Sequence, residues 1–450
     1  MANFKKMAKF IQFSWLLLLV TIIACNEPGS ITGANGQVEK TESCQSNPHN
    51  TYEVYIPELK PTKDKLPLLV IIDANGDGKF ALNKFKLAAR EYPVILAASN
   101  YVKNGVEDYE IGIQELIQDV KQKYPANNTV YLAGFSGGAR MAVGYGLAHP
   151  VNGMILCGAL AKADQIMALK CPVFSISGLD DFNFVETAQF IFNDESAPKN
   201  LSIELNNASH SWPDSLLLSN TFGFLYLSSD SEEMNMSSNE KVEAYCKNQL
   251  LRIDRLTKQD DLMKAALIAR NMALKKPFSN DEAFMKSWAE IKSNPDYNAQ
   301  LSKIEQGLSF EMSARQPYLE AFTNKDSLWW KNEIASLEKK INSEQDPYSV
   351  AMYKRIKGFW GIACYSIGNR TIKLRDVNSL KKIITVYRML EPENPYVLYF
   401  SAFPAYWKGE TGKTEKILKS AINAGFSDWG RLNEDFPKSV TLKVREQDNY

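Results

Sequence analysis

The sequence predicts an α/β protein with a doubly wound, mostly parallel sheet, followed by an all-α helical region. Between residues 51 and 228, short apolar runs alternate with segments of helical periodicity, which is typical of a parallel sheet covered on both faces. Residues 229–240 are polar and acidic, as expected of a linker. From residue 241 to the C-terminus, the periodicity is helical with almost no strand signal.

The first region contains apolar or alternating runs that predict strands and amphipathic runs that predict helices. The predicted strands cover residues 51–57, 66–73, 93–99, 128–134, 153–160, 172–177 and 201–205. The predicted helices cover residues 79–91, 107–123, 138–148, 184–192 and 213–227. This alternation gives a domain over residues 51–228.

The N-terminus has the pattern of an export signal. Three lysines precede an apolar run over residues 10–24, which is too short to predict a membrane span. The run ends in Ile22-Ile-Ala-Cys25, which resembles the lipobox of bacterial lipoproteins. The resemblance implies a signal peptide over residues 1–24, a lipid on Cys25 and a tether over 25–50. An ordinary signal peptide is the alternative. The expected location is the bacterial cell envelope, attached to a membrane on its periplasmic or surface face.

Composition excludes some classes of function. Lys+Arg and Asp+Glu both number 52, so no basic surface predicts a nucleic-acid partner. The sequence contains no CxxC pair and no histidine-rich cluster, so neither a metal nor a cofactor is expected. Five cysteines remain besides Cys25, an odd number, so at least one is expected to be unpaired.

Residues Gly134-Phe-Ser136-Gly137-Gly138 form a G-x-S-x-G pattern between a predicted strand and a helix rich in small residues. Such a turn holds a serine in strained backbone with its hydroxyl exposed at the edge of the sheet. The flanking glycines avoid clashes within the turn. We therefore predict that Ser136 is a nucleophile. A plain glycine-rich turn is the alternative.

A nucleophilic serine needs a base, and the base needs an acid that orients it. In folds with this turn the chain order is Ser, Asp or Glu, then His. Of the three histidines, only His210 follows the last predicted strand; His49 precedes the first strand, and His149 is too close to the turn. The predicted acid is Asp181, in the loop after residues 172–177, with Asp180 as its rival. Either aspartate could instead cap the next helix.

The oxyanion of an acyl-transfer reaction needs two N–H donors. Gly137 is the first predicted donor, and Asn75 is the second, with Ala74 as its alternative. Asn100 and Asn104 follow the strand at residues 93–99, where they could line the substrate site or serve only the turn.

The stretch from Asp73 to Gly78 also matches the first half of a calcium-binding loop. Its twelfth position is Lys84 rather than glutamate, and a strand precedes it, so we prefer a loop near the substrate. About ten residues separate Leu160 from Cys171, which leaves no room for an inserted lid. The site should be open unless the helical region covers it.

The stretches LPLLVIIDANGDGK, GFSGGAR, GLDDF and SHSW resemble the α/β-hydrolase family, notably its branch of minimal esterases, dienelactone hydrolases and polyhydroxybutyrate-depolymerase-like enzymes. The resemblance covers residues 51–228 and implies a carboxylic ester hydrolase acting on a small or polymeric ester. The family often carries His-Gly where this chain has Asp73-Ala74. A serine peptidase of the same fold is one alternative. A non-catalytic surface protein that binds a protein partner is another.

The predicted helical domain, residues 241–450, carries a weak repeat signal near its end. Ala402, Gly409, Leu418 and Ala421 fall at the Ala, Gly, bulky and Ala positions of a tetratricopeptide repeat, and the stretch Glu-Pro-Glu-Asn-Pro at 391–395 precedes them.

 The two prolines of that stretch interrupt the helical pattern where one repeat would pass to the next. The resemblance implies degenerate tetratricopeptide-like repeats that could hold a protein partner, and a plain helical bundle is the alternative.

Overall fold

The computed structural model describes residues 38–58, 65–192, 197–229 and 237–445. The predicted signal peptide and Cys25 lie outside the described residues, as does most of the predicted linker. No helix in the described ranges is both long and apolar enough to cross a bilayer.

One sheet of eight strands forms the centre of the first region, in the order β1-β2-β4-β3-β5-β6-β7-β8. The strands β1 and β2 pair antiparallel, as do β2 and β4, and all other neighbours are parallel. The bounds are β1 Val38–Ser43, β2 Thr51–Ile56, β3 Leu66–Ile72, β4 Ile95–Ser99, β5 Ala126–Phe135, β6 Gly153–Cys157, β7 Val173–Gly178 and β8 Leu201–Asn206. This order is that of an α/β-hydrolase sheet and confirms the predicted fold class.

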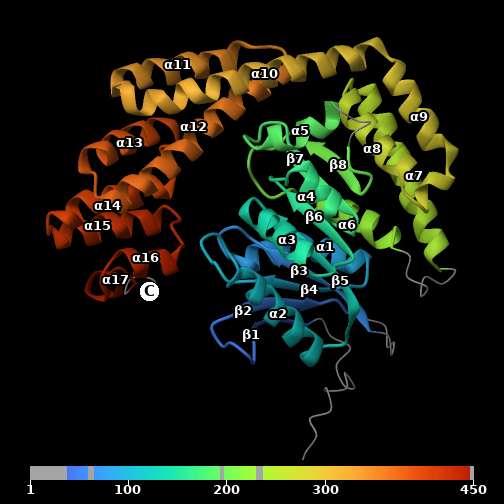
Figure 1. The fold of residues 1–450 in the computed structure, drawn as a ribbon, viewed down its shortest axis with the longest axis horizontal. Coiled ribbons are helices and arrows are strands. Elements are labelled where there is room, and N and C mark those ends of the chain that lie inside the picture. Colours follow the sequence, from blue (N-terminus) through green and yellow to red (C-terminus); the bar gives the residue numbers. More distant parts are fainter. Residues whose placement is uncertain (1–37, 59–64, 193–196, 230–236, 446–450) are drawn as a thin grey trace, which may run out of the picture.

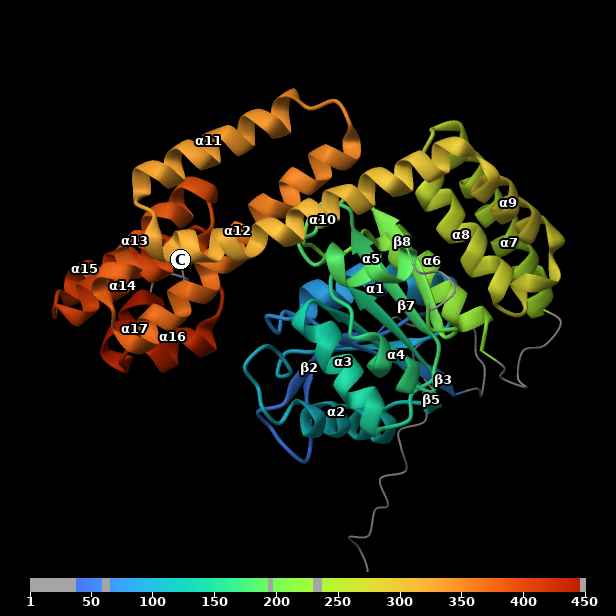
Figure 2. The ribbon, with the colours of Figure 1, turned by 45° about the horizontal axis from the view of Figure 1, so that its top comes forward.

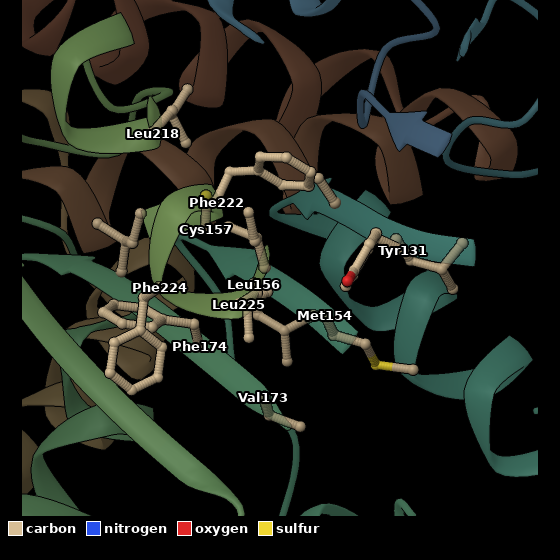
Figure 3. Packing of buried hydrophobic residues seen from close by; sticks show 14 of the residues in the cluster. Tyr131, Met154, Leu156, Cys157, Val173, Phe174, Leu218, Phe222, Phe224 and Leu225 are labelled. Atoms are coloured by element: carbon tan, nitrogen blue, oxygen red, sulfur yellow. The ribbon is translucent and has the colours of Figure 1, made fainter. Parts of the chain in front are cut away.

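Helices cover both faces of the sheet. They are α1 Gly78–Glu91, α2 Tyr109–Lys123, α3 Gly137–Ala148, α4 Ala163–Ala168, α5 Phe184–Phe192 and α6 Ser215–Leu227. Helix α6 lies against α1, and its Phe222 meets the ring of Tyr131 on β5 at 5.4 Å between centroids (Figure 3). Side chains of adjacent strand residues point to opposite faces, and Met154, which is paired with Leu132, contacts α3 at Gly146. The doubly wound arrangement therefore follows from strands that are apolar on both faces.

Strand β1 corrects the predicted tether over residues 25–50. Its sequence, VEKTES, has one apolar residue and is mostly exposed, so it gives no hydrophobic signal. Polar contacts hold it instead, because Glu42 pairs with Lys123 at 2.9 Å and accepts a hydrogen bond from Tyr124 at 2.9 Å. The ordered fold therefore begins before residue 51.

The helical region forms an arc around the sheet domain (Figures 1 and 2). Its elements are α7 Ser237–Lys258, α8 Leu262–Leu274, η2 Phe278–Asn280, α9 Glu282–Ser293, α10 Pro295–Asn324, α11 Ser327–Ser343, α12 Pro347–Leu374, α13 Val377–Leu390, α14 Pro395–Trp407, α15 Thr411–Asn423, α16 Trp429–Asp435 and α17 Lys438–Arg445. Helices α7–α9 lie beside β8, α10 crosses one end of the sheet domain, and α11–α17 complete the arc.

Two hydrophobic cores divide the chain at a different place from the predicted linker. The core of the sheet continues into α7–α9 and the first half of α10, where it includes Ile304 and Leu308. A second core begins at Ala321 and Phe322, near the end of α10, and continues to Val444. The helices that follow the linker are thus part of the sheet domain's core.

Helices α14 and α15 pack against each other as a helical hairpin at the place of the predicted repeat. Ala402, Leu418 and Ala421 are fully buried in it, and Gly409 has a φ of 75° in the turn. This arrangement fits the repeat pattern, which stays a prediction because helical hairpins occur in many folds.

The five cysteines that the structure describes are buried and unpaired: Cys44, Cys157, Cys171, Cys246 and Cys364. The prediction that at least one cysteine is unpaired is thus confirmed, and all five described cysteines are in fact unpaired.

Candidate active site

Ser136 lies in the turn between β5 and α3, at the carboxyl edge of the parallel strands. Its φ of 54° and ψ of −115° place it in a backbone conformation that residues other than glycine rarely adopt. The Ser136 N–H donates to the carbonyl of Cys157 at 2.8 Å, which fixes the turn to β6. A Cβ on Gly138 would stand 2.1 Å from the carbonyl oxygen of Ile72, so the close approach of α3 to β3 requires glycine there.

The structure brings His210 and Asp181 to this serine from two other loops. His210 Nε2 lies 2.9 Å from Ser136 Oγ. His210 Nδ1 lies 3.0 Å and 2.9 Å from the two carboxylate oxygens of Asp181. Asp181 is 1% exposed, whereas the His210 side chain is 21% exposed. This is the arrangement in which a buried carboxylate orients an imidazole against a hydroxyl.

Two aromatic rings enclose the imidazole. Phe135 and Phe182 lie 4.7 Å and 4.4 Å from the His210 ring, measured between centroids. Phe135 precedes the serine and Phe182 follows Asp181, so each ring comes from a loop of the same site. The rings limit the directions in which the imidazole can tilt.

The two rival aspartates have separate contacts. Asp181 faces His210, and its Oδ1 also accepts the N–H of Asn183 at 2.8 Å. Asp180 points away and pairs with Lys354 of α12 at 2.8 Å. The geometry thus favours Asp181 over Asp180 as the partner of the histidine.

The predicted donor Asn75 needs correction. Its N–H already donates to Asp73 Oδ1 at 2.8 Å, and its side chain is exposed. Its neighbour Ala74 is buried, and the Ala74 carbonyl accepts the N–H of Asn104 at 2.9 Å. Ala74, the alternative donor, is therefore the better candidate of the two.

Gly137 begins α3, where backbone N–H groups have no partner within the helix. A Cβ on Gly137 would stand 1.8 Å from Asn104 Oδ1, so the Asn104 amide lies directly against this glycine. Asn104 is exposed and beside the predicted oxyanion site, and its role in lining a substrate stays a prediction.

Asn100 does not have the free amide expected of a residue that lines the substrate. Its Oδ1 accepts the N–H of Gly78 at 3.2 Å, and its Nδ2 donates to Glu53 at 3.0 Å. Asn100 therefore joins the start of α1 to β2, and the alternative of turn chemistry describes it better.

Asp73 has a role that the sequence did not reveal. Its Oδ2 accepts the indole N–H of Trp212 at 2.7 Å, and its Oδ1 accepts the N–H of Asn75. A carboxylate that receives N–H donors in this way is not arranged as a calcium ligand. In the parts of the chain that the structure describes, no cluster of three or more metal-ligating side chains occurs. The only hint of this role in the sequence was that Asp73-Ala74 stands where the resembling family often carries His-Gly.

The helical region contacts loops around this site. Lys354 of α12 reaches Asp180 beside Asp181, and Asp428 at the start of α16 pairs with Lys103 at 3.3 Å, next to Asn104. Between β6 and β7 the chain forms only the six-residue helix α4, in agreement with the expected lack of an inserted lid. A pocket of about 440 Å³ lies one helical turn beyond Ser136, lined in part by Arg140, Leu160 and Glu186.

Comparisons with known proteins give a limited likeness. No protein-family model matches the chain, and no curated protein matches it. Among solved structures, a thermostable esterase is similar at 12% identity and a TM-score of 0.32, over 41% of this chain and 60% of that one. Esterase B from Lactobacillus rhamnosis is similar at 15% identity and a TM-score of 0.32, over 50% of this chain and 97% of that one. An acylaminoacyl peptidase from Pyrococcus horikoshii is similar at 11% identity and a TM-score of 0.35, over 46% of this chain and 44% of that one.

The fold class follows from the chain's own strand order, which is that of the α/β-hydrolase fold. This chain spans less than two thirds of the length of the thermostable esterase and of the acylaminoacyl peptidase.

Proposed function

We propose that this protein is a serine hydrolase that cleaves carboxylic esters through an acyl-enzyme. One observation carries the proposal: Ser136 Oγ, His210 Nε2 and Asp181 form a continuous chain of contacts of 2.9–3.0 Å at the carboxyl edge of the sheet. A serine in strained backbone, in contact with an imidazole that a buried carboxylate orients, is the arrangement that activates a hydroxyl as a nucleophile.

In the proposed reaction, Ser136 Oγ attacks the ester carbonyl carbon while His210 Nε2 takes the hydroxyl proton. Asp181 fixes the proton on Nδ1 and stabilises the imidazolium that forms. The imidazolium then gives its proton to the leaving alkoxide, which departs as the alcohol. Water then enters, gives a proton to His210 and attacks the acyl-enzyme carbonyl. As the acyl–oxygen bond to Ser136 breaks, His210 returns this proton to Ser136 Oγ, and the carboxylic acid leaves.

The oxyanion that forms in both steps needs donors aimed at it. We assign Gly137 N–H as the first donor, because it begins α3 directly after the nucleophile. Ala74 N–H is the proposed second donor, since Asn75 N–H is engaged by Asp73. The Asn104 amide, which lies against Gly137, is proposed to contact the substrate beside the oxyanion.

The test is hydrolysis by the chain from residue 26 onward. We expect cleavage of short nitrophenyl esters and covalent labelling by a fluorophosphonate probe, both lost in Ser136→Ala. Ser211→Ala is the matched control, because Ser211 is an exposed serine next to His210. Equal rates in wild type and Ser136→Ala would contradict the proposal. Peptide nitroanilides in the same assay test the peptidase alternative.

We further propose that a lipid on Cys25 attaches the enzyme to a membrane of the cell envelope. Mass spectrometry of full-length protein from bacterial membranes tests this proposal. The expected result is a mature N-terminus at Cys25 carrying acyl chains, and a soluble product in Cys25→Ser. A processed but unacylated N-terminus would contradict the proposal.

A further inference from the structure

The loop that carries Asp181 is held from outside the sheet domain by two arginines. Arg355 of α12 donates through a terminal nitrogen to the carbonyl of Leu179 at 2.7 Å. Arg315 of α10 donates to the carbonyl of Phe182 at 2.6 Å. Leu179 stands two residues before Asp181 and Phe182 directly after it, so the guanidinium groups fix the main chain on both sides of the proposed triad acid.

One buried carboxylate holds both arginines. Glu311 Oε2 accepts Nε of Arg355 at 2.7 Å, and Glu311 Oε1 accepts a terminal nitrogen of Arg315 at 2.7 Å. Glu311 is 0% exposed and Arg355 is 2% exposed. Burying such charges is costly unless their hydrogen bonds are satisfied. Here the planar fork of Arg355 binds the carboxylate with one edge and the loop with another.

Further contacts join the same loop to α12. The Arg355 guanidinium lies 5.0 Å from the ring centroid of Phe184, and Lys354 pairs with Asp180. A Cβ on Gly358 would stand 3.4 Å from the Phe182 ring, so α12 lies close to that ring as well. The loop is therefore bound through its carbonyls, its outer carboxylate and its aromatic side chains.

Two groups of this loop touch the catalytic histidine. Asp181 contacts His210 Nδ1 through both oxygens, and the Phe182 ring lies against the imidazole. We infer that Arg355, Arg315 and Glu311 are positioning residues, through which the helical region sets the orientation of His210. The inference rests on the proposed serine hydrolase. It makes the helical region an obligatory part of the enzyme rather than a separate binding module.

The expected kinetic effect is on turnover. None of the three positioning residues is placed at the substrate, so KM should change little, whereas small misplacement of reacting groups can lower rates on the order of 100-fold. We therefore expect loss of the positioning contacts to lower kcat by about 10- to 100-fold and to change KM by less than about twofold.

The main test is the double variant Glu311→Leu/Arg355→Met, which removes the two most deeply buried charges together. Arg315 loses Glu311 in this variant, but it is 22% exposed and keeps the Phe182 carbonyl as an acceptor. Its kcat and KM are measured with nitrophenyl esters, and the downfield proton NMR signal of the His210–Asp181 contact is recorded. We expect a folded protein with lower kcat and a shifted or broadened signal. Lys357→Met is the matched control, because Lys357 pairs with Glu338 at 3.0 Å within the helical region and should leave both readouts unchanged.

Arg315→Met is a milder variant in case the double variant does not fold, since the Arg315 side chain is 22% exposed. It should lower kcat severalfold. Wild-type kcat and an unshifted signal in whichever of these variants folds would overturn the inference. Failure of wild type itself to react with the fluorophosphonate probe would instead overturn the proposed function. The two failures are thus distinguishable.

Discussion

The indole N–H of Trp212 donates to Oδ2 of Asp73 at 2.7 Å, across 139 residues of sequence. Trp212 stands two residues after His210, and Asp73 directly follows β3, where the oxyanion turn begins. This one hydrogen bond therefore ties the loop of the proposed base to the turn that holds the second proposed oxyanion donor.

Replacing Trp212 with phenylalanine should remove the hydrogen bond and keep most of the ring packing. Asp73 is 4% exposed, so a carboxylate oxygen would lose its buried partner, at about 1–3 kcal/mol of the free energy of unfolding. Urea unfolding measures this loss, and kcat for nitrophenyl esters should also fall because the His210 loop is less constrained. Trp288→Phe, at a partly buried indole in α9, is the control. Unchanged stability and kcat in Trp212→Phe would contradict the prediction.

Gly138→Ala should destabilise the protein and lower its activity. The new Cβ would meet the backbone carbonyl of Ile72 at 2.1 Å, which cannot move without shifting β3. We expect a loss of about 1–3 kcal/mol in the free energy of unfolding, the usual cost of overpacking. Gly412→Ala in α15 is the control, because nothing lies within 4 Å of its Cβ position. A Gly138→Ala protein as stable as the control would contradict the prediction.

Asn271→Leu should weaken the attachment of α8 to the sheet. The Asn271 amide accepts the N–H of Ile203 at 3.2 Å and donates to the Ile203 carbonyl at 2.8 Å, so it satisfies both backbone groups at the edge strand β8. Leucine would leave both groups buried without these partners, at about 1–3 kcal/mol each. Thermal and urea unfolding measure the loss. The control Asn298→Leu, at an exposed position in α10, should change stability by less than about 0.5 kcal/mol.

Glu42 should make stability depend on acid pH. Burial alone would raise its pKa, but hydrogen bonds from Lys40, Lys123 and Tyr124 outweigh burial and lower the pKa from 4.5 to about 2. A carboxyl with a lowered folded-state pKa stabilises the fold above its unfolded pKa and loses this contribution as pH falls through the folded value. The stabilisation by Glu42 should thus be complete at pH values above about 4.5 and decline toward about 2.

The measurement for Glu42 is the difference in urea-unfolding free energy between wild type and Glu42→Gln. We expect this difference to be clear near neutral pH and to shrink as the pH approaches the lowered pKa. Hydrogen exchange of β1 amides provides a local readout, with amides of β3 as the internal reference. A difference that stays constant over the acid range would contradict the prediction.

Most of the sheet could be predicted from the sequence, because buried parallel strands are continuous apolar runs. The run before Asp73 and the run over residues 93–99 both form strands at nearly the expected positions. Strand β1 could not be predicted, since polar contacts of Glu42 with residues about 80 positions away hold it in place. The division into two cores could not be predicted either. Helical periodicity indicates that one face of a helix is buried, but it does not indicate which element packs against that face.

The contacts among Ser136, Asp181 and His210 agree with their predicted order, because each residue follows a strand and parallel strands end at one edge. Donor assignments were less predictable. The fate of the Asn75 N–H and of the Asn100 amide depends on which acceptor the folded chain brings near, and no local pattern shows this. Arg355 and Glu311 gave no signal at all, since each is an ordinary charge within a helical pattern.

Helix α10 has consequences for how the chain can be divided. It is 30 residues long, about 45 Å at the rise of an α-helix, and it supplies Ile304 and Leu308 to one core and Phe322 to the other. Glu311 and Arg315 stand between these anchors. A cut within this helix would leave each fragment with an unfilled core. A cut at the acidic linker would strip α7–α9 from the sheet. For expression, crystallisation or transfer to another scaffold, we therefore expect residues 38–445 to be needed together.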